Sequence, residues 1–158
     1  MLERFDSFAK ASVQDSAPRY ATTLGHERVG SAALLLGALT PEVRRGGDLL
    51  ARVIQINFDV TREDFLNVAQ DINHPVRRGG NELYTANVIR ACAQATEFAG
   101  KRFEAPDDFT VTNADLIVGI IHTADMVITD MFQKLGVDLF ELEHLMLYPD
   151  FWLQGWKN

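Results

Sequence analysis

The sequence predicts an all-α fold, a pseudo-twofold bundle of about eight helices made of two four-helix repeats. Three observations predict it. A segment at 24–39 has a looser copy at 99–121, each copy is followed by an amphipathic stretch closing on a similar turn, and strand patterns are almost absent from the 158 residues. A duplicated helical unit is typical of small modules in which two like halves stack on one another.

The register of the repeat follows from its glycines and turns. Three pairs of equivalent residues stand 75, 82 and 79 positions apart: Gly25 with Gly100, Gly37 with Gly119, and Asn57 with Gly136. The second copy therefore carries an insertion within 101–110 and a small deletion after Gly119. Both differences fall in segments typical of loops.

The first two helices of half one are predicted from a proline and an apolar block. Pro18 lies in the first helix and should break or restart it near Ser16, because proline lacks the N–H donor and its ring clashes with the preceding turn. The central helix is expected at 32–39, capped by Ser31. It is apolar nearly all round, so we expect it to be buried.

The third and fourth helices of half one are predicted at 48–56 and 61–70. The third should end at Asn57, a residue that tolerates the left-handed conformation. The fourth begins with a capping box formed by Thr61 and Asp64.

Half two repeats this pattern. Its first helix is expected at 82–98, with Cys92 on the apolar stripe, and its central helix opens with a capping box at Thr112 and Asp115. The third helix, 125–135, should end at Gly136, and the fourth runs from Asp138 to about 147. The predicted domain is thus 1–148 (repeat one 1–70, linker 71–81, repeat two 82–148), followed by an aromatic C-terminal tail at 149–158.

The composition and net charge limit the classes of function that the chain can have. The chain is 47% hydrophobic and 23% charged, typical of one globular domain, and its net charge of −7 disfavours nucleic acid as a partner. The single cysteine allows no internal disulfide, which fits a cytoplasmic location. The N-terminus is charged and does not read as a signal peptide, and no apolar run reaches the length of a membrane span.

No residue pattern indicates catalysis, a cofactor or a metal. The four histidines are scattered, at positions 26, 74, 122 and 144, and we expect no metal site. Cys92 is expected to be a buried structural thiol, and Ser31 and Ser16 to be helix caps. The aromatic tail, with Phe151, Trp152 and Trp156, should either fold back on the bundle or dock on a partner, and folding back is favoured.

Several segments resemble the N-terminal (double Clp repeat) domain of the Clp ATPases, especially the C-type unfoldases. They are Met1–Phe5, the Leu24–Ser31 segment with its Leu-Gly-His start, Leu34–Gly37, and Tyr84 with Thr85. The second repeat is looser, since Lys101 stands where the family has histidine. A phosphate-cradling loop is missing, so we expect a free-standing copy of the domain without the ATPase modules; the alternative is a fragment of a larger protein.

The resemblance implies a helical bundle that does no chemistry and recruits adaptors and substrates. In some members a glutamate at the start of each central helix binds phosphorylated arginine; here Ala32 and Ala114 stand at those positions, and Asp115 is one place on. The carboxylates of that mechanism are therefore absent. The resemblance, together with the tail, gives these candidate protein-binding residues: Leu2, Phe5, Ala32, Tyr84, Thr85, Ala114, Asp115, Trp152 and Trp156.

The predicted function is protein–protein recognition in Clp-type proteolysis and protein quality control. The partner would be a Clp ATPase or protease component, an adaptor or a substrate polypeptide, with no nucleic acid and no membrane. Such a module either delivers clients or acts as a decoy that titrates ligands. The alternatives are a structural scaffold subunit of a larger assembly and, less favoured, a small hydrolase built on the same fold.

Overall fold

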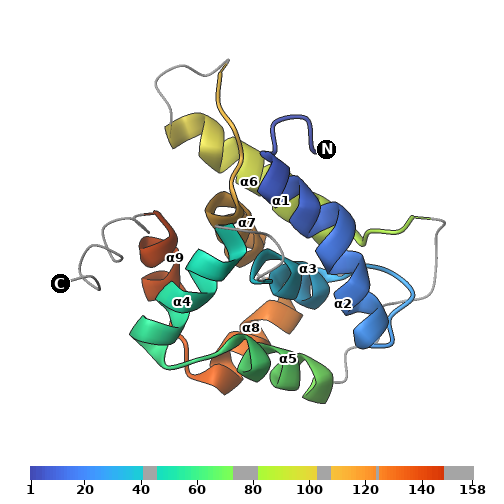
Figure 1. Ribbon diagram of the computed structural model, residues 1–158, viewed down its shortest axis with the longest axis vertical. Helices are drawn as coiled ribbons and strands as arrows, with labels where there is room; N and C mark the ends of the chain where they lie inside the picture. The colour runs from blue at the N-terminus through green and yellow to red at the C-terminus, as the bar shows by residue number, and fades with distance from the viewer. Residues whose placement is uncertain (41–45, 73–81, 103–107, 124, 148–158) are drawn as a thin grey trace.

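Helices make up nearly all the regular structure of the computed structural model, which describes residues 1–40, 46–72, 82–102, 108–123 and 125–147. The helices are α1 (Ser7–Ala11), the π-helix η1 (Ser12–Ser16), α2 (Ala17–Thr23), α3 (Ser31–Ala38), α4 (Gly46–Phe58), α5 (Arg62–Asp71), α6 (Ala86–Arg102), α7 (Asn113–Thr123), α8 (Met126–Leu135) and α9 (Leu139–Leu147) (Figure 1). Within these ranges the β pairings are two isolated bridges, so the predicted all-α class is confirmed. None of the described helices is both long and apolar enough to cross a membrane.

The first helical run is continuous from Ser7 to Thr23 and contains a π-helical turn. The N–H of Ala17 donates to the carbonyl of Ser12, which is the wide spacing of a π-helix. Pro18 follows in the first turn of α2, where a missing N–H costs least. The predicted break or restart near Ser16 is therefore wrong, because the helix continues through this point and only widens by one π-helical turn.

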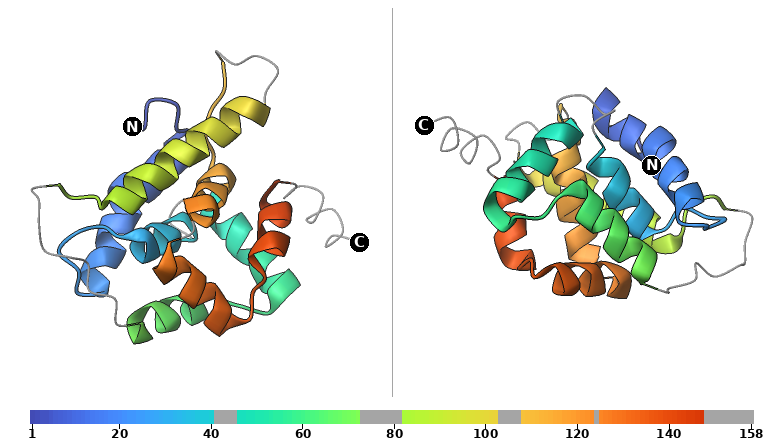
Figure 2. Two further views of the ribbon diagram at one scale, coloured as in Figure 1. Left: turned by 180° about the vertical axis from the view of Figure 1, so that it is seen from behind. Right: turned by 60° about the horizontal axis from the view of Figure 1, so that its bottom comes forward.

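The two central helices are buried on every side, as predicted. All of α3 is buried, as are residues 113–121 of α7. Within each half the central helix packs on the first helical run, α3 on η1 and α2 and α7 on α6, and the two central helices also contact each other (Figures 1 and 2).

A glycine at the same place in each central helix permits this packing. A Cβ on Gly37 would lie 2.8 Å from the nitrogen of Ala17, and one on Gly119 would lie 2.8 Å from the nitrogen of Ala95 and still closer to the carbonyl oxygen of Ala91. The helices therefore touch backbone to backbone in both halves. This matching contact is direct structural support for the repeat.

The halves also exchange contacts reciprocally. The third helix of each half packs on the central helix of the other, α4 on α7 and α8 on α3. If α1, η1 and α2 are counted as one bent helix, each half has four helices in the described chain. The arrangement is the predicted pseudo-twofold bundle.

Most predicted helix ends are confirmed by hydrogen bonds. Thr61 and Asp64 form a reciprocal capping box at α5. The N–H of Asp115 donates to the Thr112 hydroxyl, and the Thr112 N–H donates to the Asp115 carboxylate. Gly136 ends α8 in the left-handed conformation, with φ at 70°.

Two predicted helix ends are wrong. The N-cap of α3 is Gly30, not Ser31, because the Ser31 hydroxyl is turned toward another helix and makes no cap bond. The left-handed residue after α4 is Asp59, with φ at 55°, and Asn57 lies inside the helix.

Smaller differences follow at neighbouring helix starts. The first helix of half two begins at Ala86 and not at residue 82, because the preceding residues form a β-bridge. Ser16 occupies the N-cap position of α2 without a side-chain cap bond, since the chain is already helical there.

Replacement of Gly119 by alanine should destabilise the fold strongly, by about 3 kcal/mol, because the new methyl meets backbone atoms that cannot rotate away. Gly100→Ala on α6 is the matched control, since its Cβ would meet only the ring of Phe109, at 3.3 Å. The control should be neutral or stabilising through better helix propensity. Urea unfolding of both variants measures the difference, and equal stabilities would contradict the close packing.

Candidate functional site

One isolated β-bridge contains the predicted residue Phe5. Phe5 pairs with Val111, just before α7, and the two flanking hydrogen bonds join Asp6 N to Val111 O (3.0 Å) and Val111 N to Arg4 O (2.8 Å). The Phe5 side chain is buried in the core, and Leu2 packs against that core from a half-buried position. This bridge ties the start of half one to half two.

The second bridge contains Tyr84 and is the counterpart of the first. Tyr84 pairs with Val29, just before α3, and Val29 N donates to Leu83 O (2.7 Å) while Thr85 N donates to Val29 O (3.0 Å). The Tyr84 hydroxyl also donates to the carbonyl of Val13 at 2.9 Å. The start of half two is thereby tied to half one.

The four predicted residues near the chain starts of the two halves are divided between the two bridges. Leu2 and Phe5 lie at the bridge to Val111, whereas Tyr84 and Thr85 lie at the bridge to Val29. Each pair lies ahead of the central helix of the opposite half.

The starts of the central helices are almost closed to solvent. Ala32 is 6% exposed and Ala114 is 9% exposed, so each offers only the edge of a methyl group. Asp115 is 1% exposed, and its carboxylate accepts from both the N–H and the hydroxyl of Thr112 at 3.0 Å. The remaining two predicted residues, Trp152 and Trp156, lie outside the described residues.

A carboxylate joins the halves near the start of α3. Asp125 Oδ2 accepts from the Ser31 hydroxyl (2.6 Å) and from Asn87 Nδ2 (2.7 Å), while Oδ1 accepts from Val127 N and so caps α8. This junction explains why Ser31 does not cap its own helix.

An analogous polar contact anchors the first residue of α7. The Ser12 hydroxyl donates to Asn113 Oδ1 at 2.7 Å, and the contact is buried. The first residue of each central helix is therefore held by polar groups that the other half supplies.

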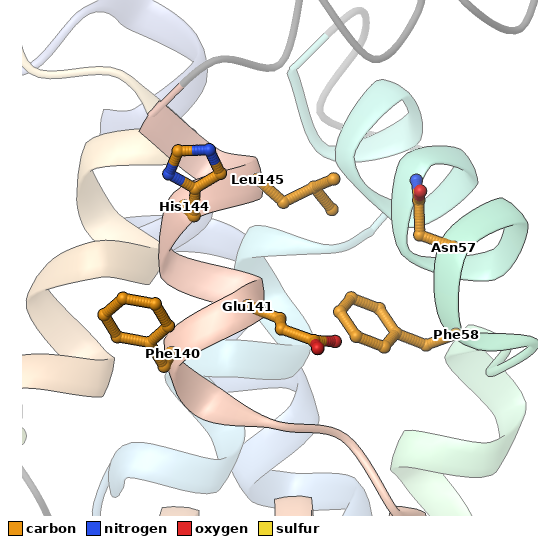
Figure 3. A pocket seen from close by; sticks show the side chains of 6 residues that line it. All are labelled: Asn57, Phe58, Phe140, Glu141, His144 and Leu145. Carbon is orange, nitrogen blue, oxygen red and sulfur yellow. The ribbon is translucent and has the colours of Figure 1, made fainter.

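A hollow of about 370 Å³ lies between α4 and α9, and sequence reasoning missed it. It is lined by Asn57, Phe58, Phe140, Glu141, His144 and Leu145. Figure 3 shows Glu141 and Leu145 on the side of α9 that faces Phe58 and Asn57, with Phe140 and His144 on its outer side. We call this feature the α4–α9 groove.

Phe140 makes the groove unusual for a solvent-facing surface. Its side chain is 81% exposed, the highest value among the large apolar side chains that the structure describes. The core stripe of α9 consists instead of Leu142, Leu145 and Met146. A phenylalanine off the apolar stripe of its helix was the sequence signal for this site.

The seam related to this groove by the pseudo-twofold, between α5 and α8, is closed. There α5 packs on α8, and the rings of Phe65 and Phe132 meet edge to face with centroids 5.6 Å apart. No comparable aromatic pair is found between α4 and α9 in the described residues. The groove is thus a departure from the twofold symmetry.

A second hollow, of about 460 Å³, lies beside the start of α5. Charged and polar side chains dominate its lining, which consists of Ala51, Arg52, Gln55, Thr61, Arg62 and Glu63. It lacks the aromatic walls of the α4–α9 groove.

The chain's cysteine is not placed for nucleophilic chemistry. Cys92 is fully buried on α6, and burial raises the pKa of its thiol to about 12. The predicted buried thiol is confirmed. In the described parts of the chain, no group of three histidine, cysteine or acidic side chains is arranged to hold a metal.

Comparison with known proteins identifies the architecture. No protein-family model matches the sequence, and no curated protein matches it. Among solved structures, the N-terminal domain of the caseinolytic protease-associated chaperone ClpD from Arabidopsis thaliana has a similar fold, with a TM-score of 0.72 over 93% of this chain and 94% of that chain at 17% sequence identity. The resemblance to a Clp N-terminal domain is thereby confirmed at the level of the fold.

Removal of the Asp125 carboxylate should cost about 2 kcal/mol of stability in Asp125→Ala, because α8 loses its cap and two side-chain donors lose their acceptor. Asp138→Ala is the control, since Asp138 caps α9 through one exposed bond, and it should cost about 1 kcal/mol or less. Denaturant titration of both variants gives the comparison. Equal losses of stability in Asp125→Ala and Asp138→Ala would show that the bonds of Asp125 to Ser31 and Asn87 contribute nothing.

The Cys92 thiol should react with a disulfide reagent at pH 8 at least about a hundredfold more slowly in the folded chain than in guanidinium, because burial suppresses the thiolate. Because the chain has one cysteine, the absorbance of the released thiolate follows this residue alone. Rapid labelling of the folded chain would show that the thiol is accessible.

Proposed function

We propose that the chain is a non-catalytic protein-recognition module of the Clp N-domain type. It binds a substrate polypeptide, an adaptor or a component of a Clp-type machine. The observation that carries this proposal is the α4–α9 groove, whose apolar walls and exposed Phe140 suit an aromatic or aliphatic side chain of a partner.

The chemistry of the groove supports polypeptide as its ligand. Phe58 provides apolar contact, while the Glu141 carboxylate and the Asn57 side-chain oxygen also line the groove and suit backbone N–H groups or a basic side chain. The Asn57 amide nitrogen already donates to the Val53 carbonyl. The similarity to the ClpD domain supports the same class of function.

The starts of the central helices support a changed choice of ligand. Ala32 and Ala114 are nearly buried, and Asp115 is engaged as a cap. A guanidinium or phosphoarginine ligand finds no exposed carboxylate on these three residues. We therefore propose that the module selects apolar segments, and that it delivers clients or competes for them.

The test is binding of the full chain to a fluorescently labelled unfolded polypeptide, followed by anisotropy. Phe140→Glu should weaken binding by about tenfold, or 1.4 kcal/mol, because a charge replaces the exposed aromatic ring. Met126→Glu is the matched control, since Met126 is 73% exposed on α8 and does not line the groove.

Equal affinity of the two variants would remove the α4–α9 groove from the proposal. A complete lack of binding to unfolded polypeptide, together with tight stoichiometric capture of one folded partner, would favour the scaffold alternative. Each variant is first compared with the unaltered chain by thermal unfolding, so that loss of folding is not mistaken for loss of binding.

A further inference from the structure

We propose that residues 148–158 of the same chain dock in the α4–α9 groove and compete there with polypeptide ligands. The competition rests on the proposed function, whereas the docking stands on the geometry. The occupant is thus a segment of this chain, and its aromatic residues Phe151, Trp152 and Trp156 supply the side chains that fill the groove.

Chain continuity places the segment beside the groove. Helix α9 lines the groove with four of its residues and ends at Leu147, immediately before the segment. The nine residues of α9 span about 13 Å, whereas the eleven residues of 148–158 reach up to about 36 Å when extended. The segment is therefore long enough to double back along the whole of α9.

Two features depart from the twofold repeat, the hollow seam between α4 and α9 and the aromatic segment at 149–158, and the segment follows directly on α9. The seam between α5 and α8 is closed by the Phe65–Phe132 contact, but the equivalent seam between α4 and α9 is hollow. Residues 149–158 lie beyond the second repeat and have no counterpart in the first. The aromatic segment, which the first repeat lacks, thus follows directly on α9. The seam between α4 and α9 is the one that, among the described residues, lacks an aromatic contact like the Phe65–Phe132 pair.

The chemistry of the segment matches the lining. Its aromatic rings suit the Phe58 side of the groove and the exposed ring of Phe140 on the outer side of α9. The Trp indole N–H and the Lys157 ammonium are donors for the Glu141 carboxylate, which lines the groove. A tethered segment also has an effective concentration in the millimolar range, so it excludes weak external ligands.

Tryptophan fluorescence tests the docking directly, because both tryptophans of the chain, Trp152 and Trp156, lie in this segment. In the unaltered full chain the emission should be shifted to shorter wavelength than that of N-acetyltryptophanamide, and iodide should quench it several-fold less. Phe140→Glu and Glu141→Lys should return both signals toward the free amide, while Met126→Glu should leave them unchanged.

Emission equal to that of the free amide in the unaltered chain would overturn the docking, as would signals that the groove variants do not change. A signal that appears only as protein concentration rises would assign the contact to a second copy and would also overturn the intrachain proposal. Dilution over two orders of magnitude separates these cases.

The competition has its own readout. The Trp152→Ser/Trp156→Ser double variant should bind the labelled unfolded polypeptide at least threefold more tightly than the unaltered chain. Unchanged affinity in a chain whose fluorescence shows docking would overturn the competition. If no variant binds polypeptide, the proposed function fails, while the fluorescence result still decides the docking.

Discussion

The architecture depends on backbone-to-backbone contact between each central helix and the first helical run of its half. Gly119 lets α7 approach α6 where alanines form the opposite surface, and Gly37 lets α3 approach η1 and α2. Helices this close leave no room for a side chain at the crossing, so dispersion contacts are dense there. This contact places α3 and α7 at the centre of the bundle. Because they lie there, α4 can pack on α7 and α8 on α3, each in the opposite half.

Polar contacts then fix how the halves meet. The two bridges at Phe5 and Tyr84 give hydrogen-bond partners to the backbone of the buried residues Val111 and Val29. The Asp125 junction and the Ser12–Asn113 bond anchor the first residues of the central helices. Because these bonds are directional, they specify one relative orientation of two apolar surfaces that could otherwise slide.

The sequence predicted correctly those features that depend only on neighbouring residues. The capping boxes at Thr61 and Thr112 and the turn at Gly136 were found because each depends on residues within one helical turn. Ser31 was wrongly predicted to cap α3 because its hydroxyl donates instead to the Asp125 carboxylate, which is far away in the sequence. The off-stripe Phe140 marks only the α9 side of the α4–α9 groove, because the hollow itself lies between two helices from different halves that do not close on each other.

The reciprocal bridges make the two halves depend on one another. Each half completes the other, because the strand-like start of one pairs with the segment ahead of the central helix in its twin. Either half taken alone would leave the backbone groups of these bridges without their partners. The two repeats are therefore one cooperative unit, in which neither half keeps its own bridge when the other unfolds.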